Sequence, residues 1–131
     1  MRVPITYPGT KQEDRPMGSA PLSPAVRLGN TLFISGQVAI DPITGAIVGD
    51  DVATQTHQVL TNIKTLVEAA GLTMKNVGKV GIFLTDVADF DTMNAVYAEF
   101  FDAPFPARAT VGITLNNPSL LVEMDAIAVA V

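Results

Sequence analysis

The sequence predicts a single α+β domain in which two helices cover one face of a mixed β-sheet. The chain has 131 residues, of which 48% are hydrophobic and only 16% are charged, as expected for one compactly folded domain. Apolar residues alternate with polar ones in several short stretches and recur at helical spacing in two longer ones. Turn-forming residues separate these stretches, so the expected element order is β-β-β-α-β-α-β-β.

Residues 1–20 are expected to form an irregular N-terminal arm, and residues 21–131 the domain itself. Five of the nine prolines fall within the first 24 residues, where they interrupt regular structure, although a short strand fits Val3 to Thr6. The segment from Val26 to Val38 contains Gly29-Asn30 between two apolar stretches, which is a tight-turn pattern. We therefore expect a β-hairpin there.

The first helix is predicted to begin after one of two adjacent aspartates, Asp50 and Asp51, because their side chains suit an N-cap. It is predicted to end near Ala70, since Gly71 supplies a common stop signal. His57, the only histidine, falls on the solvated side of this helix, opposite the apolar residues. We therefore do not expect His57 to act as an acid or a base.

A second helix is predicted from about Val87 to Phe101, after the strand "VGKVGIFLTD". Its apolar side carries four residues at a spacing that is typical of core contacts: Phe90, Met93, Tyr97 and Phe100. Asn94 lies on the same side, so its amide is expected to be buried and to bind neighbouring backbone groups.

Two ionisable residues interrupt the last two predicted strands, Ala107 to Leu115 and Leu121 to Val131, which we expect to be neighbours. Arg108 begins the first strand and Glu123 lies within the second, each among apolar residues. Because an isolated buried charge costs on the order of several kcal/mol, each needs a partner. Two interpretations stay open: the two residues form a structural ion pair, or Arg108 binds the anionic group of a ligand while Glu123 transfers protons.

Charge and composition exclude several classes of function. Thirteen acidic and eight basic residues give a formal net charge of −5, which opposes binding to nucleic acid or anionic lipid. The lack of cysteine and the single histidine exclude a thiol nucleophile and a metal site built on cysteine or a histidine cluster. The sequence shows no signal-peptide pattern and no membrane-spanning run, so a cytoplasmic protein is expected. The high apolar content for a chain of this size indicates a homo-oligomer.

Five separated segments together resemble the RidA-like family of enamine/imine deaminases, also called the YjgF or UK114 family. The match spans about Pro21 to Val131, and the segments are "GNTLFISGQVAIDPITG", "QTHQVLTNIKTLVEAAG", "LTDVADFDTMNAVYAEFF", "PARATVGI" and "VEMDAIAV". The resemblance implies a chorismate-mutase-like fold and a homotrimer whose central sheets form a barrel. It also implies ligand clefts between neighbouring subunits.

The resemblance also implies roles for particular residues. In deaminating members of the family, the arginine that matches Arg108 binds the substrate carboxylate, and the glutamate that matches Glu123 positions or activates the attacking water. Two further pocket residues of the family match Ser35 and Asn94. This chain departs from the family at two pocket positions: it has Leu22 where the family has a tyrosine and Thr110 where many members have a cysteine. The family reaction needs neither a metal nor an organic cofactor.

The expected function is hydrolysis of reactive 2-imino acids, of the 2-aminoacrylate and 2-iminopropanoate type, to 2-oxo acids and ammonia. One alternative is a non-catalytic sensor or binding module for a small carboxylate, and another is a pathway-specific deaminase such as a 2-aminomuconate deaminase. An endoribonuclease or translation-inhibitor role is disfavoured, because it would need basic residues along an RNA path.

Overall fold

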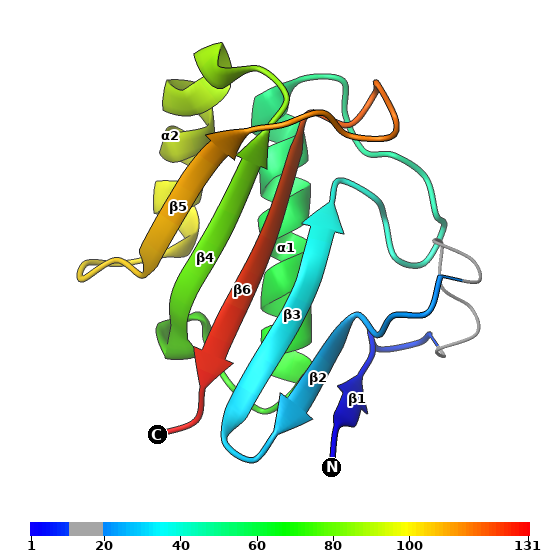
Figure 1. Ribbon diagram of the computed structural model, residues 1–131, viewed down its shortest axis with the longest axis vertical. Coiled ribbons are helices and arrows are strands. Elements are labelled where there is room, and N and C mark those ends of the chain that lie inside the picture. Colours follow the sequence, from blue (N-terminus) through cyan, green and yellow to red (C-terminus); the bar gives the residue numbers. More distant parts are fainter. Residues whose placement is uncertain (11–19) are drawn as a thin grey trace.

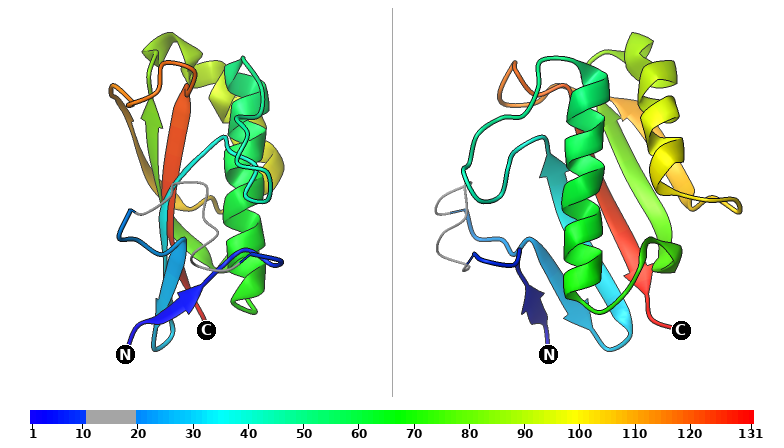
Figure 2. Two further views of the ribbon diagram at one scale, coloured as in Figure 1. Left: turned by 90° about the vertical axis from the view of Figure 1, so that its right-hand side faces the viewer. Right: turned by 180° about the vertical axis from the view of Figure 1, so that it is seen from behind.

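The computed structural model describes residues 1–10 and 20–131. Their strands form one mixed sheet in the order β1-β2-β3-β6-β4-β5, covered on one face by helices α1 and α2 (Figure 1; Figure 2). Strands β4 and β5 are parallel, and all other neighbouring strands are antiparallel. The bounds are β1 Val3–Ile5, β2 Ala25–Leu28, β3 Thr31–Val38, β4 Val77–Leu84, β5 Ala107–Gly112 and β6 Val122–Val129. The predicted element order and fold class are confirmed.

One expectation about the sheet is wrong. Strands β5 and β6 follow each other along the chain but are not neighbours, because β4 lies between them and pairs with both. The segment between α2 and β5 brings the chain back to the end of the sheet at which β4 begins. Strand β5 therefore runs parallel to β4 at the sheet edge. Both strands are also shorter than predicted.

The N-terminal half of the sheet follows the predicted pattern. Strands β2 and β3 form the expected hairpin, and Gly29 in its turn has a φ of 58°, a left-handed conformation that glycine adopts readily. The short strand β1 exists as expected and pairs with β2, with Val3 opposite Arg27. The first residues of the arm therefore extend the sheet.

Helix α1 covers Val52–Ala69, close to its predicted bounds. The Asp51 side chain accepts a hydrogen bond from the Thr54 backbone at 2.8 Å, and Gly71 follows the helix with a φ of 80°. Helix α2 covers only Phe90–Phe100, because the first part of the predicted helix is a separate 3₁₀ turn over Val87–Asp89.

The hydrophobic core fills the space between the sheet and the two helices. Its largest fully buried side chains include Leu32, Leu60, Ile63, Leu66, Ile82, Leu84, Met93 and Met124. Tyr97 is also buried, and Phe100 is half-buried and packs against the core, but Phe90 is 42% exposed, so the prediction of core contacts for the four α2 residues is wrong for Phe90. Phe90 begins α2 and packs on Arg108 instead of the core.

Among the described residues, no helix covers the other face of the sheet (Figure 2). Three large apolar side chains on it, Phe33, Val111 and Ile127, are each more than a third exposed. Within the described residues, no helix is both long and apolar enough to cross a membrane.

Candidate functional site

Arg108 is fixed against helix α2, on the face of the sheet that the helices cover. Its Nη2 donates a hydrogen bond of 2.5 Å to Oδ1 of Asn94. Its guanidinium carbon lies 4.9 Å from the centre of the Tyr97 ring and 5.5 Å from that of Phe90. Cation–π contacts and a charge-assisted hydrogen bond therefore hold the guanidinium in one position.

The neutral amide and the two aromatic rings around Arg108 leave its charge uncompensated. Asn94 is a neutral amide, and it binds the guanidinium rather than the backbone groups that we expected. Burial raises the pKa of Tyr97, and the nearby Arg108 charge opposes that rise. Within the described residues, three buried hydroxyls have no hydrogen-bond partner, and two of them belong to Tyr97 and Thr110. Thr110 follows Arg108 by two positions in β5, on the same face.

Glu123 lies on the opposite, open face of the sheet. Its neighbours in β6, Val122 and Met124, are buried beneath the helices, so strand alternation turns the Glu123 side chain the other way. The carboxylate lies against Gly36, where an added Cβ would be only 2.7 Å from Oε2. Burial raises the pKa of Glu123 above its usual value, and the Asp125 charge raises it further.

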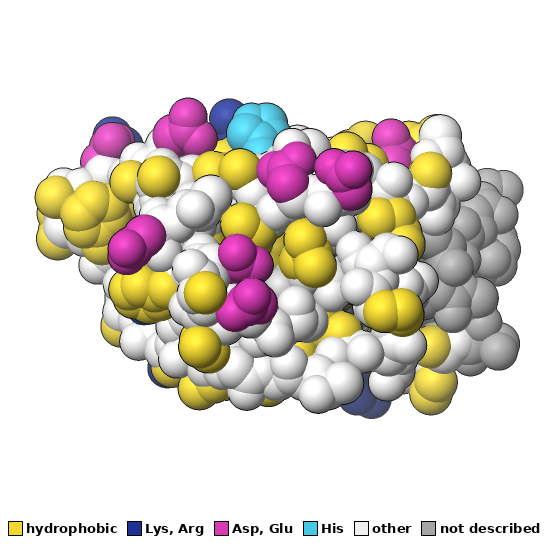
Figure 3. All heavy atoms as spheres, turned by 90° about the horizontal axis from the view of Figure 1, so that it is seen from above, with side chains coloured by type: hydrophobic (Ala, Val, Ile, Leu, Met, Phe, Trp, Pro, Cys, Tyr) yellow, Lys and Arg dark blue, Asp and Glu magenta, His cyan; other side chains and the backbone are white. Residues whose placement is uncertain are grey.

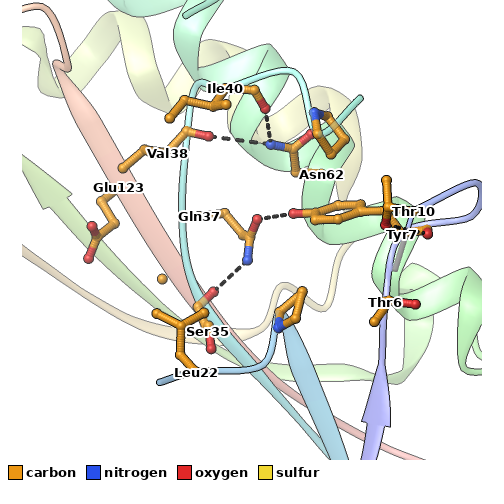
Figure 4. Close-up of a pocket in the computed structure, with 13 residues that line it drawn as sticks. Thr6, Tyr7, Thr10, Leu22, Ser35, Gln37, Val38, Ile40, Asn62 and Glu123 are labelled. Carbon is orange, nitrogen blue, oxygen red and sulfur yellow. Dashed lines mark hydrogen bonds between the residues drawn. The ribbon is translucent and has the colours of Figure 1, made fainter. Parts of the chain in front are cut away.

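A pocket of about 120 Å³ adjoins Glu123 and is also lined by Ser35 and Leu22 (Figure 4). It lies where β3 is irregular, because the pairing of β3 with β6 shifts register between Ile34 and Gln37. Ser35 Oγ donates a 2.6 Å hydrogen bond to the backbone carbonyl of Ser23, which ties β3 to the segment before β2. Three of the predicted site residues therefore meet in one pocket.

Sequence reasoning missed two residues of this pocket, Tyr7 and Gln37. The Tyr7 hydroxyl donates to Gln37 Oε1, and Gln37 Nε2 donates to the Ser35 carbonyl at 3.0 Å. Burial raises the pKa of Tyr7 well above its usual value. Gln37 could have been noticed as a lone amide in an apolar strand, but nothing in the sequence indicates that Tyr7 lies beside it.

The predicted site residues form two groups on opposite faces of the sheet. Strand β4 pairs with both neighbouring strands, placing Arg108 beside Val80 and Glu123 beside Phe83. Val80 and Phe83 are three positions apart, and an odd separation turns their side chains to opposite faces. An ion pair between Arg108 and Glu123 of one chain is therefore excluded.

His57 lies where it was predicted, exposed on α1. Its ring makes an edge contact with Phe100, with ring centres 5.2 Å apart, and its Nδ1 lies 3.5 Å from the Thr61 hydroxyl. It contacts neither group of candidate residues. No group of three or more potential metal ligands occurs among the residues that the structure describes.

A family model described as Endoribonuclease L-PSP matches residues 12–130 of the sequence. The chain belongs to the endoribonuclease L-PSP family. This is also the YjgF/RidA family, so the resemblance inferred from the sequence motifs is confirmed.

Members of the endoribonuclease L-PSP family match along almost the whole chain. A RutC family protein of Pyrococcus horikoshii is 47% identical over 119 residues, which cover 91% of this chain and 93% of that protein. The 2-iminobutanoate/2-iminopropanoate deaminase of Salmonella typhimurium is 42% identical and covers 89% of this chain and 93% of its own length. The crystal structure of E. coli TdcF with bound serine has a TM-score of 0.84 and 36% identity, covering 98% of this chain and 99% of its own.

Proposed function

We propose that the protein is an enamine/imine deaminase, which hydrolyses 2-imino acids of the 2-aminoacrylate and 2-iminopropanoate type to 2-oxo acids and ammonia. The observation that carries the proposal is the position of Arg108, held by a neutral amide and two aromatic rings. A guanidinium fixed in this way offers its remaining donors to a planar carboxylate. Relatives about 40% identical that are named 2-iminobutanoate/2-iminopropanoate deaminase support the same activity.

The chemistry needs one cation and one proton carrier. Arg108 binds the substrate carboxylate and orients the imine carbon. The imine reacts as its N-protonated iminium, so Glu123 accepts a proton from water as the water oxygen bonds to that carbon, which yields a neutral carbinolamine. Glu123 then returns the proton to nitrogen, the carbon–nitrogen bond breaks, and the hydroxyl proton leaves with ammonia, so the products are a 2-oxo acid and ammonium. Neither a metal nor an organic cofactor takes part.

The opposite positions of Arg108 and Glu123 require two copies of the chain. We infer that the site forms where the Arg108 edge of one copy meets the Glu123 pocket of the next, in a homotrimer. An interface between two different surfaces closes into a symmetric assembly when the rotation between copies fits, and three copies then share three identical sites. The exposed apolar side chains on the open face, Phe33, Val111 and Ile127, support burial between copies.

An RNA substrate is not favoured, although the family description names an endoribonuclease. The formal charge of the chain is −5. The end of the molecule shown in Figure 3 carries several Asp and Glu side chains and few Lys or Arg. Acidic surface repels phosphate, and RNA binding relies on basic grooves.

The proposal is tested by measuring ammonia release from 2-iminopropanoate generated in solution. We expect Arg108→Ala to lose nearly all activity and Arg108→Lys to be poor, because a lysine cannot bind a carboxylate through two parallel hydrogen bonds. His57→Gln serves as the control and is expected to keep full activity, since His57 contacts neither group. Full activity in a well-folded Arg108→Ala protein would contradict the proposal. Carboxylate binding without turnover in the wild type would indicate a non-catalytic sensor instead.

A further inference from the structure

A second carboxylate lies beside Glu123 on the open face of the sheet. Asp125 follows Glu123 by two positions in β6, and residues two positions apart in a strand share a face. Met124 and Ala126, which alternate with them, are buried beneath the helices. At this spacing the two carboxylates stand about 7 Å apart along the strand. Both residues are half-buried, so water screens the repulsion between their charges only in part.

The backbone of β4 holds the Asp125 carboxylate in place. The Gly81 amide donates a hydrogen bond of 3.1 Å to Oδ1 of Asp125, and the two residues are directly opposite each other in the β4–β6 pairing. A Cβ added at Gly81 would overlap with this oxygen, so the carboxylate occupies space that only a glycine leaves open. Gly36 in β3 leaves space for Glu123 in the same way. The negative charge of Asp125 is therefore fixed beside Glu123.

Within the described residues, Asp125 acts on Glu123 more strongly than the cations on the same side of the sheet. Burial raises the pKa of Glu123, and the Asp125 charge raises it further. Lys79 in β4 is exposed and pairs with a residue four positions beyond Glu123 in β6. Arg2, in the neighbouring hollow, is exposed as well, and water screens exposed charges. Tyr7, across the pocket, stays neutral because burial raises its pKa.

We propose that Asp125 is a positioning residue for the deamination reaction, and that its fixed negative charge makes Glu123 a stronger base toward the attacking water. The inference rests on the proposed function. A nearby negative charge disfavours a second one, so Glu123 binds the proton from water more readily. Arg108 of the next copy acts in the opposite direction, and Asp125 offsets its effect. A general base works best when the pKa of its conjugate acid lies near the working pH.

The test removes the charge and keeps the hydrogen bond. Asp125→Asn has nearly the same shape, and its amide oxygen can still accept from Gly81. We expect the acid limb of kcat/KM for 2-iminopropanoate to move to lower pH by roughly one unit, from the repulsion of two charges at this separation. At pH 7, kcat/KM should fall about threefold, because the base is weaker. Asp125→Glu keeps the charge and is expected to keep the wild-type limb.

Controls separate this role from a structural one. Glu68→Gln removes an equal charge from an exposed position of α1 and is expected to change neither the limb nor the rate. If Asp125→Asn does not fold, Asp125→Ser removes the charge with a smaller side chain and should move the limb in the same direction. A folded variant without the charge whose limb stays at the wild-type pH would overturn the inference and leave the deaminase proposal intact.

A titration without substrate separates failure of the inference from failure of the proposed function. Carbon-13 NMR follows the Glu123 carboxyl in the wild type and in Asp125→Asn, and its signal is identified by its absence from Glu123→Gln. We expect the midpoint to be roughly one pH unit lower in Asp125→Asn. If no imine is hydrolysed, the deaminase proposal fails, and this shift still supports the action of Asp125 on Glu123. Equal midpoints would overturn it.

Discussion

Arg108 and Glu123 lie on opposite faces of one sheet, although the resemblance to the RidA-like family assigns both to a single site. Strand β4 separates their strands, and their partners in β4 are three positions apart. Arg108 faces helix α2 with Asn94, whereas Glu123 faces away from the helices beside Gly36. Any mechanism that uses both residues must therefore combine two chains.

Asn94 is expected to position Arg108 rather than to touch the reacting atoms. Asn94→Ala removes the hydrogen bond to the guanidinium, and loss of such a charged bond should lower kcat/KM by about tenfold, mainly through KM. Asn94→Asp should lower it further, because a carboxylate would neutralise Arg108 and compete with the substrate. Thr92→Ala, at an exposed position of the same helix, is the control. Steady-state kinetics on the four proteins checks this; an unchanged KM in Asn94→Asp would contradict it.

Gly36 is expected to be required for the position of Glu123. An alanine Cβ at this residue would lie 2.7 Å from Oε2 of Glu123, so the flexible carboxylate would have to move. Gly36→Ala should therefore lose most of the turnover while its melting temperature changes little. Gly78→Ala provides the matched control, because an added Cβ there meets nothing within 4 Å. Comparable activities of the two alanine variants would argue against a role for Glu123.

The raised pKa of Glu123 predicts both a pH profile and a stability effect. If the carboxylate is the base, kcat/KM should fall with decreasing pH along a limb centred above 4.5, the usual value for a glutamate. Because the pKa is higher in the folded than in the unfolded chain, ionisation of Glu123 opposes folding. This cost is absent below the unfolded pKa and fully present above the folded one.

Glu123→Gln should accordingly lose most of the activity, and its kcat/KM should no longer fall with decreasing pH along that limb. The variant should nevertheless melt at the same or a higher temperature than the wild type at pH 7. Calorimetry at pH 4 and pH 7 checks the sign, since the advantage of the variant should shrink at the lower pH. A variant that melts well below the wild type at pH 7 would show that the carboxylate stabilises the fold.

Local sequence signals predicted most of the fold, because each depends on residues close together in the chain. The Gly29-Asn30 turn, the Asp51 cap and the apolar side of α1 are all of this kind. The insertion of β4 between β5 and β6 depends on pairing between distant segments, which periodicity does not encode. The prediction for Phe90 was wrong for a related reason. Helical spacing shows which residues share one side of α2, but it does not show where the sheet under that helix ends.

The candidate residues were found through family motifs, but their arrangement was not. Arg108 and Glu123 stand out as charges in apolar strands, and this pattern is the same whether their side chains share a face or not. The side of the pocket formed by Tyr7 and Gln37 depends on two features: a hydrogen bond between residues 30 positions apart in the sequence, and a register shift in β3. Neither leaves a local trace in the sequence.

Subunit mixing tests the two-chain site most directly. Arg108→Ala and Glu123→Gln are each expected to be nearly inactive alone, and they should be co-expressed so that mixed assemblies form. If each site takes Arg108 from one copy and Glu123 from the next, random mixing in equal amounts restores roughly one quarter of the wild-type activity, because that share of sites has both native residues. Mixed assemblies that stay as inactive as the separate variants would contradict the account.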